Sequence, residues 1–158
     1  MKISPEILLS KSDGFSYNKI LITGSDESFI NYVKGQIVEI FKNKKYHVDM
    51  SGNYNKGLTG DLFSEKKILF LLNEYSSKKN KLESADLNNH SILIASPNGK
   101  KVNLIKSEFS RSKEGLLVEC YPLSKKSKGL VLKQYIDNKN LRVSSDVFWY
   151  IVENFDNR

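Results

Sequence analysis

Cysteine, proline and long apolar runs are scarce in this chain, and each shortage excludes a class of protein. Its 158 residues include one cysteine, Cys120, and three prolines. A lone cysteine excludes an internal disulfide and a cysteine-rich metal site. Proteins without disulfides are typical of reducing compartments. With only nine glycines, the chain is neither collagen-like nor of low complexity. We therefore expect one ordinary folded domain, with at most a small appendage, in the cytoplasm.

The apolar runs are too short for a membrane protein. The longest, at positions 68–72, has five residues, whereas a bilayer span needs roughly 20. Near the N-terminus, Glu6 and Lys11 interrupt the apolar residues, so no signal peptide is predicted. We expect no membrane partner.

Positive charge is in excess, with 25 Lys and Arg against 18 Asp and Glu and a formal net charge of +7. Two interpretations stay open. Clustered cations release counterions from phosphates, which favours a nucleic-acid partner. Alternatively, a composition rich in lysine and asparagine is what an AT-rich coding sequence supplies. Only Arg111, Arg142 and Arg158 are arginines, the residue whose planar fork best reads bases and phosphates.

Short apolar runs predict the strands of a sheet. They are continuous rather than alternating, which indicates strands covered on both faces, as in a parallel sheet. These runs lie at residues 20–22, 68–72, 92–95 and 116–120, and residues 46–50 predict a further strand.

Helices are predicted between these strands. Phe29, Val33 and Ile37 recur at helical spacing and form a core-facing stripe, and residues 102–109 predict a shorter helix. Alternating strands and helices predict an α/β fold, with an open parallel sheet and helices on both faces.

The pattern changes after residue 123. Residues 124–139 place apolar side chains among lysines, and Ser144 and Asp146 are good cap and first-turn residues for another helix. Its stripe contains Phe148 and Val152, while Trp149 adds apolar surface on another side. We expect residues 124–158 to begin a helical second domain that the chain cuts short.

The first predicted strand ends where a nucleotide-binding α/β protein would hold phosphate, at Gly24, Ser25, Asp26 and Glu27. A phosphate-binding loop needs several glycines and a Lys-Ser/Thr pair, and neither is present. Two carboxylates at the start of the following helix complement its dipole and repel phosphate. The segment therefore predicts a tight turn with a helix cap and no nucleotide.

No residue pattern supports catalysis or metal binding. Cys120 ends an apolar run, which is typical of a buried thiol rather than a nucleophile. His47 and His90 are isolated and have no matching carboxylate pattern. We therefore expect no catalytic residue, no metal site and no cofactor.

Leu62 and Phe63 form an adjacent apolar pair between a glycine-bearing polar loop and a charged run. Either both side chains fold inward as a small cluster, or they are exposed and form an anchor for a pocket on another protein. The pattern leaves both alternatives open.

Basic residues after position 123 are the candidate nucleic-acid contacts. Lys125, Lys126 and Lys128 are the closest group, and Lys133 and Arg142 follow. Such residues would bind DNA without sequence preference and with a steep dependence on salt.

Four segments resemble the delta subunit of the bacterial DNA polymerase III clamp loader. Residues 19–27 (KILITGSDE) resemble its first strand followed by Gly-x-Asp/Glu, and residues 61–72 (DLFSEKKILFLL) resemble its Leu-Phe segment and next strand. Residues 91–97 are similar to a strand that precedes a lysine-rich helix, and residues 118–123 to the junction with the second domain. The order and spacing agree across most of the chain.

The resemblance implies an AAA+-like α/β domain without a functional nucleotide site at residues 1–123, and the start of a helical lid domain at residues 124–158. Only the first lid helix, residues 145–155, can be matched. The family's C-terminal collar joins the other clamp-loader subunits, and it has no match here. The resemblance thus predicts either a fragment or a shortened homologue.

In that family the Leu-Phe pair is a wedge that enters a pocket of the ring-shaped sliding clamp, the beta subunit. Leu62 and Phe63 match the pair. The resemblance implies a non-catalytic subunit that acts in DNA replication by binding and opening the clamp, with ATP hydrolysis left to partner subunits. The alternative hypothesis is a small nucleotide- or phosphate-dependent α/β enzyme with its ligand near Gly24.

Overall fold

A single parallel sheet organises the chain. The computed structural model describes residues 1–10, 17–52, 67–72 and 90–155. The strands in these ranges are β1 (Lys2–Ile3), β2 (Lys19–Gly24), β3 (His47–Gly52), β4 (Ile68–Leu72), β5 (His90–Ala95) and β6 (Gly115–Cys120). They pair in the order β1-β6-β2-β5-β4-β3, and all neighbours run parallel.

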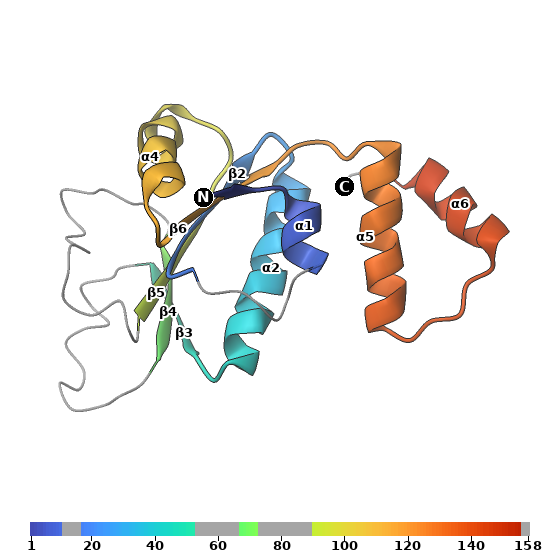
Figure 1. Cartoon of the computed structure of the whole chain (residues 1–158), viewed down its shortest axis with the longest axis horizontal. Helices are drawn as coiled ribbons and strands as arrows, with labels where there is room; N and C mark the ends of the chain where they lie inside the picture. The colour runs from blue at the N-terminus through green and yellow to red at the C-terminus, as the bar shows by residue number, and fades with distance from the viewer. Residues whose placement is uncertain (11–16, 53–66, 73–89, 156–158) are drawn as a thin grey trace.

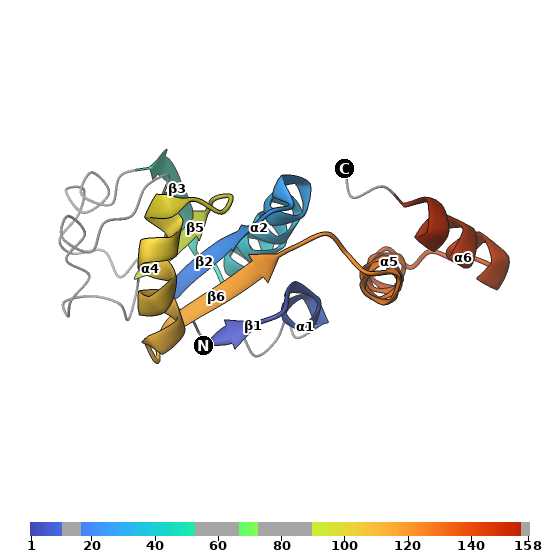
Figure 2. The same ribbon diagram turned by 90° about the horizontal axis from the view of Figure 1, so that it is seen from above.

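Helices cover both faces of this sheet. Figure 1 shows α4 (Lys100–Arg111) on one face, and α1 (Pro5–Ser10) and α2 (Glu27–Asn43) on the other. Helices α5 (Lys125–Asn138) and α6 (Ser145–Asn154) continue outward beyond α1, away from the sheet, and the view from above agrees (Figure 2). No helix within the described ranges is long and apolar enough to cross a membrane.

The two faces of the sheet bury separate apolar clusters, because successive strand residues point to opposite sides. In β6, Leu116 and Val118 belong to the cluster under α1 and α2. Leu117 belongs to the cluster under α4, together with Phe109. Val131 of α5 also joins the first cluster, so α5 packs on the α/β body.

The predicted fold class is confirmed: the protein has an open parallel sheet with helices on both faces. The strands predicted from apolar runs lie within β2, β4, β5 and β6, and residues 46–50 overlap β3. The stripe predicted for α2 is buried, and Ser124 and Ser144 cap α5 and α6 through their side chains. The division into domains at residues 123 and 124 stays a prediction.

The first two elements were not predicted. β1 has two residues, which pair with Leu117 and Val118 of β6. α1 follows at once and buries Leu8 and Leu9 under α2 and α5. A two-residue strand and a six-residue helix are too short to show a period, so only their packing partners define them.

We predict opposite effects from alanine at two glycines. A Cβ at Gly115 would lie 2.4 Å from the carbonyl oxygen of Phe109, so Gly115→Ala forces the α4–β6 junction apart and lowers the free energy of unfolding by about 1–3 kcal/mol. Gly35 is exposed on α2, and no atom outside the neighbouring helix backbone lies within 4 Å of the added carbon, so Gly35→Ala raises that free energy by about 0.5–1 kcal/mol. Urea unfolding measures both. Equal effects would contradict the junction as described.

Candidate functional site

The candidate site is the edge of the sheet where β2, β5 and β6 end. Open α/β sheets bind ligands at the carboxyl ends of their strands, so this edge is where a nucleotide would be sought first. The turn of residues 24–27 joins β2 to α2 there, next to the end of β6.

Gly24 brings the turn unusually close to β6. It lies opposite Cys120 in the strand register and has a φ of +149°, a conformation that favours glycine. A Cβ at this position would lie 1.7 Å from the carbonyl oxygen of Cys120. Only a residue without a side chain fits.

Two backbone N–H groups of the turn are bound by the protein itself. The amides of Ser25 and Asp26 both donate to the carbonyl oxygen of Cys120, at 3.1 and 3.3 Å. In phosphate-binding turns, amides at a helix N-terminus point to the anion instead. Here the amides of Ser25 and Asp26 bind an oxygen of the protein itself.

Asp26 adds a negative charge to the same turn. Its Oδ1 accepts the amide of Phe29 at 2.9 Å and so caps α2, while Glu27 is the first residue of the helix. The Asp26 side chain is buried, and its Oδ2 has no hydrogen-bond partner among the described residues. A buried carboxylate whose charge is only partly compensated repels phosphate.

Cys120 is not a nucleophile in this setting. Burial, and after it the negative charges of Asp26 and Glu6, raise the pKa of the thiol to about 12. The thiol therefore stays protonated at neutral pH, as the sequence predicted for a buried cysteine.

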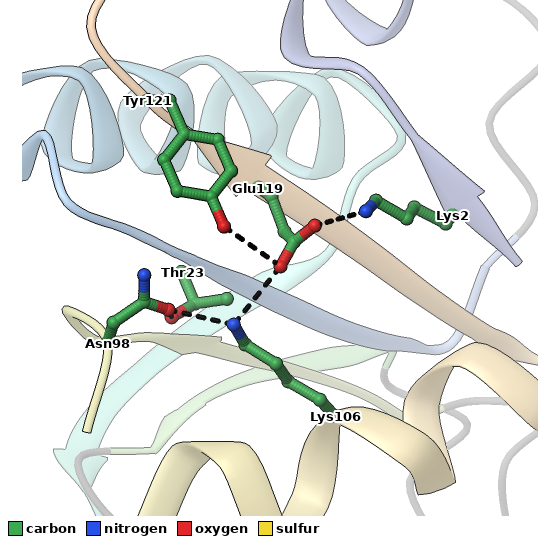
Figure 3. Close-up of polar contacts among 6 residues, drawn as sticks. All are labelled: Lys2, Thr23, Asn98, Lys106, Glu119 and Tyr121. Carbon is green, nitrogen blue, oxygen red and sulfur yellow. Dashed lines mark hydrogen bonds and ion pairs between the residues drawn. The ribbon is translucent and has the colours of Figure 1, made fainter. Parts of the chain in front are cut away.

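A polar network fills the α4 side of the same edge (Figure 3). Glu119 pairs with Lys2 through Oε2 and with Lys106 through Oε1, the latter at 3.1 Å, and its Oε1 also accepts the Tyr121 hydroxyl at 3.3 Å. Lys106 continues to Asn98 Oδ1 at 2.8 Å. The ammonium groups of Lys2 and Lys106 are thus both bound to a carboxylate.

Glu119 is the centre of this network. The hydrogen bond from Lys2 is the largest effect that lowers the pKa of Glu119, and Lys106 adds a second bond and further positive charge. Only 12% of the Glu119 side chain is exposed. The carboxylate therefore holds the N-terminal strand, α4 and the end of β6 together.

Sequence reasoning missed this network, because its members come from distant parts of the chain. One local sign was available: Glu119 is a charged residue within the apolar run of β6. A charge in a buried strand requires a partner. The sequence does not identify that partner.

The other predicted site residues have different outcomes. Leu62 and Phe63 lie outside the described residues, so their exposure stays a prediction. His47 and His90 lie on β3 and β5, with β4 between them. The described ranges contain no cluster of three or more His, Cys, Asp or Glu residues that would bind a metal ion.

Two of the three lysines predicted to contact DNA hold α6 against α5. Lys125 Nζ pairs with Glu153 Oε1 at 2.7 Å, and Lys128 Nζ donates to the carbonyl of Phe155 at 2.6 Å. Lys126 is exposed, and it has no ion pair within the part of the chain that the structure describes.

Solved structures with a similar arrangement come from the replication initiator DnaA. The AMPPCP-bound DnaA of Aquifex aeolicus has a TM-score of 0.50 and 20% identity, over 96% of this chain and 56% of that one. DnaA bound to AMPPCP and single-stranded DNA has a TM-score of 0.46 and 22% identity, over 95% and 54%. Domain III of the Thermotoga maritima initiator has a TM-score of 0.43 and 14% identity, over 95% and 74%. This chain thus spans about half the length of the first two structures.

Neither protein-family models nor curated proteins gave a match to this sequence. At 20% identity, the likeness to the Aquifex structure shows the fold alone. The expected AAA+-like fold is confirmed in this way. The assignment to the delta subunit of the clamp loader stays a prediction.

We predict that Glu119→Gln lowers the free energy of unfolding at pH 7 by about 1–2 kcal/mol, because Lys2 and Lys106 lose their charged partner. The folded pKa of Glu119 lies below its ordinary value of 4.5. Its charge therefore contributes stability that is present above pH 4.5 and is lost as the pH falls through the lower folded pKa.

The measurement is urea unfolding of wild type and Glu119→Gln from pH 7 to pH 3, and the difference between them should shrink as the pH falls below 4.5. Glu114→Gln is the matched control, since it removes an exposed carboxylate just before β6. A difference that stays constant across this range would contradict the role of the charge.

Proposed function

We propose that this chain is a non-catalytic, AAA+-like subunit of the replication clamp loader, of the delta type. It would bind the sliding clamp through Leu62 and Phe63 and leave ATP hydrolysis to partner subunits. The main support is the closed turn at residues 24–27, whose amides bind Cys120.

The closed turn argues against a nucleotide-dependent enzyme. To accept a phosphate, the amides of Ser25 and Asp26 would have to leave Cys120, and each such bond contributes about 0.5–1.5 kcal/mol. The phosphate would then meet the buried carboxylate of Asp26. Lys2 and Lys106 do not compensate this charge, because both are paired with Glu119.

The context of the fold supports a role in DNA replication. The solved structures that the chain resembles are those of a replication initiator. The segments that resemble the delta subunit begin with β2 and the turn after it, continue into β4 and β5, and end at the junction after β6. Both likenesses are to replication proteins. The likeness to the DnaA structures shows only a shared fold.

Burial of Leu62 and Phe63 in a pocket would contribute enough free energy to support a protein contact. Adjacent Leu and Phe side chains bury roughly 300 Å² in a pocket, and at about 25 cal/mol per Å² this is about 7 kcal/mol before the costs of association. A ligand shifts an equilibrium by its differential affinity for the two states. A pair that fits only the open clamp would therefore stabilise the open form without ATP.

We predict no saturable heat when ATP and Mg²⁺ are titrated into the protein in a calorimeter. Asp26→Asn is the informative variant, because it removes the charge and keeps an oxygen that can cap α2. It should also bind no ATP, since the amides of Ser25 and Asp26 remain bound to Cys120. Saturable binding by wild type would favour the alternative hypothesis of a nucleotide-dependent enzyme.

We predict that Leu62→Ala/Phe63→Ala weakens binding to the sliding clamp of the same organism by at least about 100-fold, the scale of paired hot-spot residues. Surface plasmon resonance measures the affinity, and circular dichroism checks the fold. The matched control is Met50→Ala/Leu104→Ala, which removes two apolar side chains that are 72% and 79% exposed elsewhere. Equal affinity of wild type and the Leu62/Phe63 variant would remove the proposed contact.

A further inference from the structure

Two aromatic side chains on α6 are displayed to solvent. Trp149 is 50% exposed and Tyr150 is 68% exposed, although the same helix buries Val152. Trp149 and Tyr150 are adjacent, and a contiguous exposed apolar patch is typical of an interaction site. The surface around Trp149 is therefore a candidate binding surface.

Trp149 has neighbours on both α5 and α6. The Phe148 ring packs edge-on against it, with centroids 5.3 Å apart and an interplanar angle of 88°. Lys125 Nζ lies 6.0 Å from the centre of the indole ring and is itself fixed by Glu153. A ring that is already oriented loses little freedom when a ligand stacks on it.

The indole borders a shallow hollow of about 540 Å³, lined by Lys125, Lys126, Trp149 and Glu153. Two lysines and one acidic residue thus line the hollow, which leaves it with one positive charge in excess. Glu153 is the acidic member of the hollow, and Lys125 pairs with it. Lys126 is left to meet an anion from solution.

We propose that Trp149 and Lys126 form a binding site for single-stranded nucleic acid, with a base stacked on the indole and the ammonium group on a neighbouring phosphate. An oriented aromatic face beside lysines is how proteins bind single strands without sequence preference. A duplex does not fit, since its bases are already stacked on each other and only its phosphates would reach Lys126.

A protein partner is the rival occupant of this surface. Protein interfaces are enriched in aromatic residues and arginine and depleted of lysine. Here two lysines line the hollow beside the indole, and none of its described lining residues is an arginine. The charge and composition of the site thus favour a nucleic acid. The proposal is independent of Leu62 and Phe63, so it stands or falls separately from the clamp contact.

Trp149 is the only tryptophan of the chain, so its fluorescence reports directly on stacking. We predict that a 12-nucleotide oligothymidylate quenches this emission saturably, with an affinity that falls steeply as salt increases. Inorganic polyphosphate, which has charge but no bases, should leave the emission nearly unchanged. A blunt duplex of the same length should quench much less than the single strand.

Two variants distinguish base stacking on Trp149 from the phosphate contact of Lys126. With a labelled oligothymidylate and anisotropy as the readout, Trp149→Leu should weaken binding about 10- to 100-fold. The control Tyr135→Leu, which removes a side chain that is 47% exposed on α5, should have little effect. Lys126→Gln alters an exposed side chain and should reduce the salt slope by about one phosphate contact.

Several results would overturn the proposal. They are no quenching by the oligonucleotide, equal quenching by polyphosphate, or unchanged oligonucleotide affinity in both Trp149→Leu and Lys126→Gln. Self-association in sedimentation that Trp149→Leu abolishes, in a protein that binds no oligonucleotide, would assign the surface to a second copy of the chain instead.

Discussion

Two hydrogen bonds, from the amides of Ser25 and Asp26 to the carbonyl oxygen of Cys120, hold the turn between β2 and α2 against the end of β6. While they bind Cys120, these two amides are not directed to an anion from solution. Gly24 makes the internal contact possible, because any side chain there would collide with β6. The start of α2 is therefore held by the protein's own backbone, and no ligand is required to order it.

The end of β6 is fixed from both sides of the sheet. Successive strand residues point to opposite faces. The Cys120 side chain is therefore buried on the α2 side, while the Glu119 side chain lies on the α4 side and binds Lys2 and Lys106. The chain then leaves the sheet through Tyr121, whose hydroxyl also contacts Glu119. The path to α5 and α6 thus starts from a strand end that is held by both the backbone of the turn and the polar network.

Much of the fold could be predicted from the sequence, because buried parallel strands and a buried helical stripe leave continuous or periodic apolar patterns, as in β4 and α2. The acidic character of the turn was also visible at Asp26. Its closure was not, because the acceptor is a backbone carbonyl that any residue at position 120 would supply. The pair between Lys2 and Glu119 was equally hidden, since 117 positions separate the two residues and no local pattern connects them.

The structure also bears on the two interpretations of the basic charge. A purely compositional excess would leave lysines scattered over the surface without particular partners. Lys106 and Lys128 instead have defined partners, Glu119 and the carbonyl of Phe155, and both contacts join elements of the fold. Because these lysines serve the fold, their number says little about nucleic acid. The lysine that bears on that question is Lys126, which lies beside an exposed indole and pairs with no acidic residue in the described ranges.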